Sequence, residues 1–344
     1  MKRLFLVLLT FSLLGGVSQK TYAQIDFDSF LEAGAGDAQR LLELYLQPAF
    51  EGIGFGMNSG WYNTAKPHKF LGFDVSASLS MARVPDSRQF FTFENSEFTN
   101  VFYADGTSVS TPTLFGPNLG PDDLPELSFR DFDDVDNDGD TMEELIRISA
   151  PTGLGIDEGS LPFNAVPTPM AQIGIGLFKG TEVKLRYLPE VSLGDDGSVN
   201  MFGIGIMHDI TSYIPGEKLL PIDLSIFAGY TNLTSEIYIN DEQTQSAKFD
   251  ASSWVVQFVA SKKIAFVTVF GGLGYSNYDV DFGMLGTFNT ESGTLIDPIN
   301  FNFKNNGVRT NVGLRIKLLF LTLTGEYALQ EYNTLTAGVG ISIR

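Results

Sequence analysis

The stretch that decides the fold is residues 71–81, Leu-Gly-Phe-Asp-Val-Ser-Ala-Ser-Leu-Ser-Met. Apolar side chains stand at every second position, and small or polar residues fill the positions between them. Successive side chains of a β-strand point to opposite faces, so this pattern predicts a strand with one apolar face. The 11 residues of this stretch exceed the usual strand length of about 5–6. They match the ~9–11 residues that a tilted strand needs to cross a bilayer.

The same alternation returns nine times after residue 168, which makes ten expected strands. The further ranges are 171–177, 183–187, 202–206, 222–230, 254–260, 265–275, 308–316, 321–329 and 335–343. Their connections alternate between tight turns, such as Lys179-Gly180, and long segments, such as 82–168. Short turns at one end and long loops at the other are typical of an outer-membrane barrel. If the sheet closes, every backbone N–H and C=O group has a hydrogen-bond partner on a neighbouring strand, as the lipid environment requires.

We therefore predict an all-β fold, a transmembrane antiparallel up-and-down β-barrel of about ten strands with an N-terminal helical element. The count ranges over about 8–14 strands, because the segment 82–168 could hide another hairpin near 98–104 and 145–149. Residues 70–344 would form this barrel, and 82–168 would be a long acidic outer loop.

Two segments precede the barrel. Residues 1–23 resemble a secretory signal peptide, because basic Lys2 and Arg3 precede an apolar run that ends near Thr21-Tyr22-Ala23. Residues 24–69 would form a helical or plug segment, in which Asp37 caps a helix that Pro48 limits. This segment would either fold into the lumen or pack under the mouth of the barrel.

The composition excludes several classes of function. The formal net charge of −19 argues against nucleic acid as a partner. The absence of cysteine excludes disulfides, thiol catalysis and thiolate-bound metals. Only His68 and His208 are present, and neither accompanies a Gly-x-Ser-x-Gly motif. We therefore expect that the protein is not an enzyme.

One acidic segment resembles a calcium-binding loop. The spacing of Asp134, Asp136, Asp138 and Gly139 fits the opening of such a loop, in which alternate carboxylates converge on a hard cation. The twelfth position is Leu145 instead of the usual Glu, so the resemblance is partial. The candidate Ca²⁺ ligands are Asp134, Asp136, Asp138, Asp140, Glu143 and Glu144. The alternative is a solvated acidic loop without a specific ion.

Charged residues also fall on the faces that the alternation turns inward. These candidate lumen-lining residues are Lys184, Arg186, Asp223, Arg309, Arg315 and Glu326. They would either line a polar path for a solute or form ion pairs that stiffen a filled core.

Several stretches resemble an uncharacterised family of Bacteroidetes-type outer-membrane β-barrel proteins. The resemblance rests on Phe50-Glu51-Gly52, on Asn58 to His68, on Pro112 to Gly116, on His208-Asp209-Ile210 and on Tyr213 to Gly216. It implies a barrel in the cell outer membrane, but it brings no activity. A looser likeness to long-chain fatty-acid transporters, which have an N-terminal hatch and a hydrophobic route, concerns architecture only.

These patterns lead to two hypotheses about function. The first is a passive channel or transporter for a small or apolar solute. The alternative is a structural or surface-interaction barrel whose acidic loop binds Ca²⁺. In both cases the expected partners are outer-membrane lipid, lipopolysaccharide and the barrel-assembly machinery, and the sequence predicts no particular oligomeric state.

Overall fold

The computed structural model describes residues 31, 34–131, 144–156, 164–192, 197–215, 221–240, 242–290 and 293–343. The predicted signal peptide, residues 1–23, lies outside these residues. Within the described part of the chain, no helix combines the length and the apolar character needed to cross a membrane.

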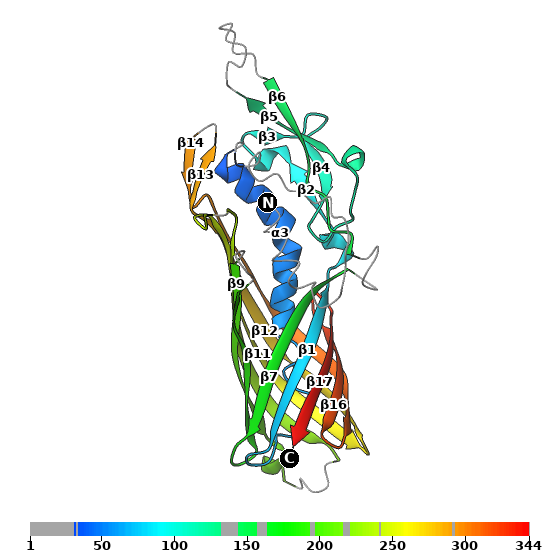
Figure 1. The fold of residues 1–344 in the computed structure, drawn as a ribbon. Coiled ribbons are helices and arrows are strands. Elements are labelled where there is room, and N and C mark those ends of the chain that lie inside the picture. Colours follow the sequence, from blue (N-terminus) through cyan, green and yellow to red (C-terminus); the bar gives the residue numbers. More distant parts are fainter. Residues whose placement is uncertain are drawn as a thin grey trace.

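Ten antiparallel strands close into one barrel, which confirms the predicted fold class and strand number (Figure 1). The first strand pairs with the last strand on one side and with β7 on the other, so the sheet closes on itself. Around the barrel the order is β1-β17-β16-β15-β12-β11-β10-β9-β8-β7. The barrel strands are β1 (Phe73–Arg83), β7 (Ala165–Gly176), β8 (Thr181–Ser192), β9 (Gly197–Asp209), β10 (Asp223–Tyr238), β11 (Ser246–Ile264), β12 (Val267–Leu285), β15 (Ile299–Leu318), β16 (Leu321–Leu329) and β17 (Thr334–Ile343).

The two ends of the barrel differ in the length of their connections. At the turn end, tight turns join β7 to β8, β11 to β12 and β15 to β16, and Lys179, Ala265 and Leu319 adopt positive φ angles of 56°, 54° and 55° there. The end of β17 lies at the same end (Figure 1). A longer connection with the 3₁₀ helix η6 (Thr211–Tyr213) joins β9 to β10. The opposite end, the loop end, carries the β13–β14 hairpin, formed by Thr287–Thr290 and Gly293–Ile296.

The described residues of the longest connection, 84–131, 144–156 and 164, form a small domain above the loop end, which we call the loop-end domain (Figure 1). Its strands pair in two small sheets, β2-β4 and β3-β5-β6, which are separate from the barrel. The possible extra hairpin at 98–104 and 145–149 therefore adds no strand to the barrel. The elements are η1 (Asp86–Arg88), β2 (Phe90–Glu94), η2 (Asn95–Glu97), β3 (Val101–Phe102), β4 (Ser108–Pro112), η3 (Pro121–Asp123), β5 (Glu126–Asp131) and β6 (Glu144–Ser149).

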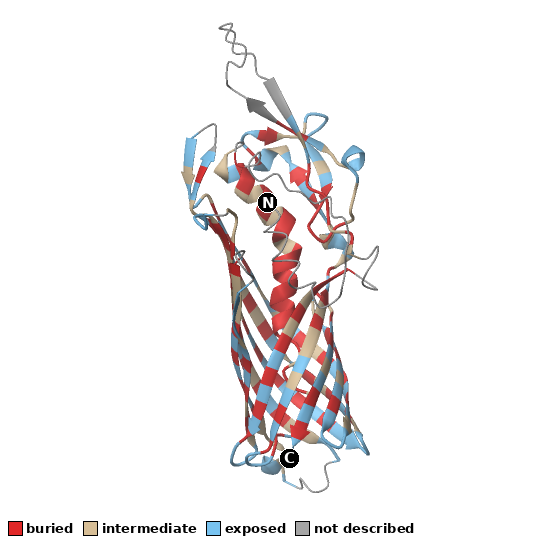
Figure 2. Cartoon of the chain, viewed as in Figure 1, coloured by how far each residue is buried: buried red, intermediate tan, exposed pale blue. Residues whose placement is uncertain are grey.

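The helix α3 (Ala35–Met57) descends from the loop-end domain into the barrel (Figures 1 and 2). Every residue from Pro48 to Met57 is buried, because the barrel wall surrounds this part of the helix. The prediction that Pro48 limits the helix is wrong: the helix continues for nine residues beyond it. Packing on every side holds the backbone helical despite the hydrogen bond that proline removes.

Glycines bring the helix close to the barrel wall. A Cβ atom added to Gly52, Gly54 or Gly56 would lie 2.3 Å from Val166, Tyr278 or Thr168, respectively. These glycines look like helix breakers in the sequence. In the structure they let the helix backbone approach strands β7 and β12.

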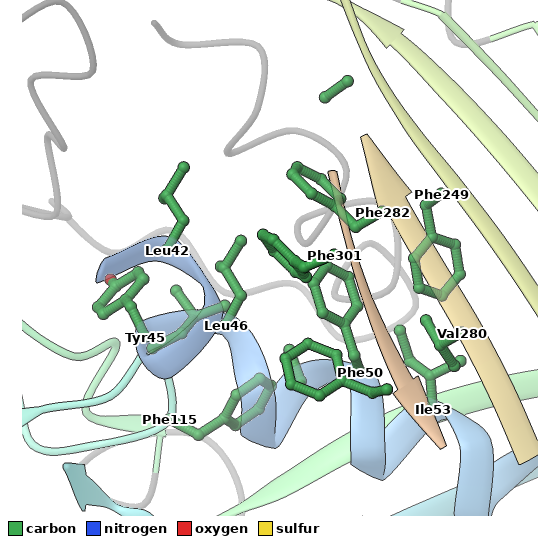
Figure 3. Close-up of a cluster of buried hydrophobic side chains, with 14 of the residues drawn as sticks. Leu42, Tyr45, Leu46, Phe50, Ile53, Phe115, Phe249, Val280, Phe282 and Phe301 are labelled. Carbon is green, nitrogen blue, oxygen red and sulfur yellow. The ribbon is translucent and has the colours of Figure 1, made fainter. Parts of the chain in front are cut away.

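Phe50 anchors the helix to an aromatic cluster on the strands (Figure 3). Its ring centroid lies 5.2 Å from that of Phe249, 5.4 Å from that of Phe282 and 5.8 Å from that of Phe303. Aromatic pairs at such separations contribute beyond the area they bury. The half of the lumen near the loop end is therefore an apolar core between the helix and the sheet.

The long strands exchange the polarity of their two faces partway along. On β15, Asn302 and Lys304 face outward near the loop end, whereas Val312 and Leu314 face outward near the turn end. The inward side changes the other way, from Phe301 and Phe303 to Arg309, Asn311 and Arg315. The strand β12 repeats the exchange, with Asp279 and Asp281 outward above Leu273 and Tyr275. Only the half near the turn end therefore presents an apolar outer surface.

The glycine packing leads to the first prediction. Gly54→Ala should destabilise the protein by about 1–3 kcal/mol, because the new methyl group must displace the Tyr278 ring. Gly36→Ala is the matched control on the same helix, since nothing lies within 4 Å of its added Cβ. This control should be neutral or gain up to about 1 kcal/mol from helix propensity. Denaturant unfolding in one detergent measures both, and equal stabilities would contradict the packing.

Candidate functional site in the barrel lumen

The chain continues through the lumen after α3, and we call residues 35–69 the plug. Trp61, Tyr62 and Ala65 are buried in a second apolar cluster with Phe227 and Phe270. The rings of Trp61 and Tyr62 each lie 5.4 Å from the Phe227 ring.

Small residues on the barrel wall make room for these rings. A Cβ atom on Gly229 would lie 2.9 Å from the Trp61 ring, and one on Gly272 would lie 2.1 Å from the Tyr62 hydroxyl. The inward glycines thus fit the shape of the plug at the level of Trp61 and Tyr62.

Arg186 holds the point where the helix ends and the lumen segment begins. Its guanidinium donates hydrogen bonds of 2.6 Å to the carbonyl oxygens of Met57 and Ser59. The same group lies 3.6 Å from the centre of the Trp61 ring, in a cation–π contact. A cation at a helix C-terminus also complements the helix dipole. Arg186 therefore stabilises both the end of the helix and the ring that follows it.

Two further polar contacts lie at the middle of the lumen. The Tyr62 hydroxyl lies 2.9 Å from Asn311 Oδ1 and 3.0 Å from Gln257 Oε1. Arg309 donates a hydrogen bond of 2.7 Å to Glu326, and both side chains are nearly fully buried. These contacts fill part of the middle of the barrel and pair the charge of Arg309 with that of Glu326.

A buried ionic cluster closes the turn end. His68, the end of the plug, contacts Glu182 through both its backbone nitrogen, at 2.7 Å, and its ring Nδ1, at 2.8 Å. Its other ring nitrogen lies 3.1 Å from the Ser342 hydroxyl. Asp74 lies 3.5 Å from the His68 ring. The cluster thus joins the plug to strands β1, β8 and β17.

Lys184 occupies the centre of this cluster. Its Nζ lies 2.5 Å from Glu182 Oε1 and 3.7 Å from Asp74 Oδ1. His68, Asp74 and Glu182 offer one ligand atom each within 4.8 Å of one another, the grouping expected of a metal site. The lysine ammonium already supplies the positive charge that a metal would bring. We therefore interpret the cluster as a structural contact of the plug.

A third set of contacts fixes the plug near the loop end. The Tyr332 hydroxyl donates a hydrogen bond of 2.7 Å to Glu51 on the helix. Burial and the negative charge of Glu51 raise the pKa of Tyr332, so it stays a donor at neutral pH. Arg88 of the loop-end domain lies 3.8 Å from Glu51 and 3.2 Å from Glu331. Helix, barrel and loop-end domain therefore meet around one buried carboxylate.

The structure places the predicted lumen residues as follows. Lys184, Arg186, Arg309, Arg315 and Glu326 are buried inside the barrel and contact the plug, the neighbouring strands or both. Asp223 lies at the turn end, where it forms a 3.1 Å ion pair with Lys66 of the plug and stays partly exposed. The structure brings them into separate clusters along the lumen instead of one site.

The acidic candidates for Ca²⁺ have a different outcome. Asp134, Asp136, Asp138, Asp140 and Glu143 lie outside the described residues. Glu144 begins strand β6, paired with Asp131. The calcium site stays a prediction.

Sequence reasoning did not select several residues of these clusters. His68 resembles a turn or interfacial histidine in the sequence, and Trp61 lies in a polar stretch with no periodic pattern. Glu182, Lys184 and Arg186 stand at consecutive inward positions of one strand, a signal of a shared charged surface. Their partners on the plug have no sequence signal, because only the folded path of residues 58–69 brings them there.

Little free volume remains among these groups. One cavity of about 20 Å³ lies beside Gly60, Tyr62 and Thr336, and another of about 80 Å³ lies between Phe55, Tyr278 and Gln330. Since a water needs about 10–15 Å³ by this measure, the first cavity has room for one or two waters and the second for about five to eight.

The ionic cluster leads to the second prediction. Lys184→Met should destabilise the protein by about 3–5 kcal/mol, because it leaves two buried carboxylates without their cation. Lys248→Met is the control, since its pair with Asp250 is exposed and contributes at most about 1 kcal/mol. Adding Glu182→Gln to Lys184→Met should restore part of the loss. Denaturant unfolding measures all three, and a Lys184 effect no larger than that of Lys248 would refute the assignment.

No curated protein matches the sequence significantly. Among solved structures, the attachment invasion locus protein Ail of Yersinia pestis is similar, with 8% identity, a TM-score of 0.26 and coverage of 80% of this chain and 98% of that chain. The translocator domain of the autotransporter NalP from Neisseria meningitidis is also similar, with 10% identity, a TM-score of 0.29 and coverage of 90% and 98%. A family model matches residues 1–343, and the chain therefore belongs to DUF6588, a family of unknown function.

Proposed function

We propose that this protein is an outer-membrane barrel, closed by its own plug, that holds the loop-end domain at the cell surface. The observation that carries the proposal is the combination of an apolar outer band with a filled lumen. A membrane location makes outer-membrane lipid, lipopolysaccharide and the barrel-assembly machinery its expected partners.

The outer surface near the turn end supports a membrane location. On β15 the apolar outward positions run from Val308 to Leu318. Ten steps of about 3.3 Å, tilted by about 40°, correspond to a band about 25 Å tall, the height expected of a transmembrane barrel.

Aromatic side chains mark both borders of this band. Exposed rings stand on five consecutive strands at the border toward the loop end, namely Tyr187, Phe202, Tyr230, Trp254 and Tyr275. Exposed phenylalanines stand at the turn end, namely Phe70, Phe178, Phe266 and Phe320. Such girdles at the two membrane interfaces are typical of these barrels.

The connections support one orientation in the membrane. Outer-membrane barrels have short turns on the periplasmic side and longer loops outside. The turn end then faces the periplasm, and the loop-end domain stands at the cell surface.

The plug supports a closed barrel over a passive channel. The helix and the segment 58–69 occupy the lumen from the loop end to the turn end, and three sets of contacts hold them there. The competing hypothesis is transport of a small or apolar solute, which would require the plug to move.

The apolar band leads to the third prediction. Leu314→Arg, at mid-height of the band, should destabilise the barrel by about 2–4 kcal/mol, because it places a charge in hydrocarbon. Asn302→Arg is the control on the same outward face of the same strand, and it should change the stability by less than about 1 kcal/mol. Unfolding from lipid vesicles measures both. Equal losses for the two variants would contradict the position of the band.

The filled lumen leads to the fourth prediction. The full-length protein in a planar lipid bilayer should show no steady conductance. A variant that lacks residues 35–66 should conduct ions, because its lumen would keep the polar side chains of Arg186, Arg309 and Asn311. Steady conductance of the unmodified protein would refute the closed barrel and favour the channel, whatever the deletion does.

A further inference from the structure

We propose that the first turns of helix α3 lie at the cell surface, so that the barrel passes its own N-terminal helix outward during assembly. The inference rests on the proposed location and orientation of the barrel. The substrate of this export step is an unfolded stretch of the same chain.

The N-terminal end of the helix is bound within the loop-end domain. The Asp37 carboxylate accepts hydrogen bonds of 2.7–3.1 Å from the backbone nitrogens of Thr99, Asn100 and Val101. Arg40, one turn further along, donates hydrogen bonds of 3.0 and 2.8 Å to Glu97. Burial by itself would lower the pKa of Arg40, but its hydrogen bonds to Glu97 and Glu43 raise it. The start of the helix is therefore fixed on the side of the loop-end domain.

The chain then runs through the barrel in one direction. The helix ends at Met57, whose carbonyl meets Arg186 in the lumen. His68 lies in the ionic cluster at the turn end, and the Leu71 backbone nitrogen donates a hydrogen bond to the carbonyl of Gly176 there. Strand β1 starts at Phe73, opposite Ile343 at the end of β17. Residues 37–71 thus span the barrel from the loop end to the turn end.

The described part of the lumen is densely packed around the helix and the segment that follows it. Helix residues 48–57 are all buried against the wall, and their glycines touch strands β7 and β12. Below them, Trp61 and Arg186 fill the lumen. The first turn of the helix therefore lies on the side of the loop-end domain, which is the outer side in the proposed orientation.

This path has a consequence for assembly. An exported chain arrives from the periplasm, whereas the first residues of α3 lie on the outer side in the folded protein. The residues of the helix that lie beside the loop-end domain must then cross the membrane while the barrel forms around them. The polar wall at mid-lumen, with Arg186, Arg309 and Asn311, suits an extended backbone that needs hydrogen-bond partners before the helix takes its final position.

Single cysteines test the inference, since the natural chain has none. The test variant is Gly36→Cys, an exposed position at the start of α3. Thr107→Cys reports on the loop-end domain, and Lys179→Cys reports on a tight turn at the turn end; both positions are exposed. The probe is a maleimide coupled to polyethylene glycol, which does not cross the outer membrane. It is applied to intact cells and to cells with a permeabilised outer membrane.

We expect Gly36→Cys and Thr107→Cys to react fully in intact cells, and Lys179→Cys to react only after permeabilisation. If Thr107→Cys reacts in intact cells but Gly36→Cys requires permeabilisation, the inference fails while the proposed function stands. Failure of Gly36→Cys in both preparations also overturns it, because that position is exposed in this arrangement. If Thr107→Cys itself requires permeabilisation, the proposed orientation is wrong.

Discussion

A closed sheet of ten strands has a bore of fixed width, and the rest of the structure depends on how that bore is filled. Protein interiors tolerate few voids, so the plug and the wall must match in shape. They match through residues of opposite size. Glycines on the helix meet Val166, Tyr278 and Thr168 of the wall, whereas glycines of the wall meet Trp61 and Tyr62 of the plug. At these positions small side chains stand opposite large ones, and the helix fits closely against the wall.

The exchange of polarity along the strands follows from what lies on each side of the wall. Near the loop end the wall separates water from an apolar helix, so Phe301 and Phe303 face in and Asn302 and Lys304 face out. Near the turn end it would separate lipid from a lumen that holds buried charges beside the Trp61 cluster, so Arg309 and Arg315 face in and Val312 and Leu314 face out. One strand thus serves as a strand of a soluble protein over half its length and as a membrane strand over the rest.

The barrel could be predicted from sequence because alternation is local. The sequence of each strand by itself shows which residues lie on the inner face and which on the outer face. All ten strands and the alternation of short and long connections follow from it. The helix beyond Pro48 could not be predicted, because local propensity opposes it and only the surrounding wall reverses that preference. Only the strand residues of the ionic clusters could be predicted. The inward positions of Lys184 and Arg186 follow from alternation, but His68 and Trp61 meet them through a path with no periodic signal.

The two halves of the lumen also fix the position of the plug along the barrel axis. A shift of the helix by one turn, about 5.4 Å, toward the turn end would bring Phe50 closer to the level of Arg309 and Asn311. A shift the other way would separate Arg186 from the carbonyls of Met57 and Ser59 and leave those groups buried without partners. Each displacement exposes an apolar ring to charge or a carbonyl to an apolar wall, and both are unfavourable. The boundary between the apolar and the charged parts of the lumen therefore favours one position of the plug along the barrel axis.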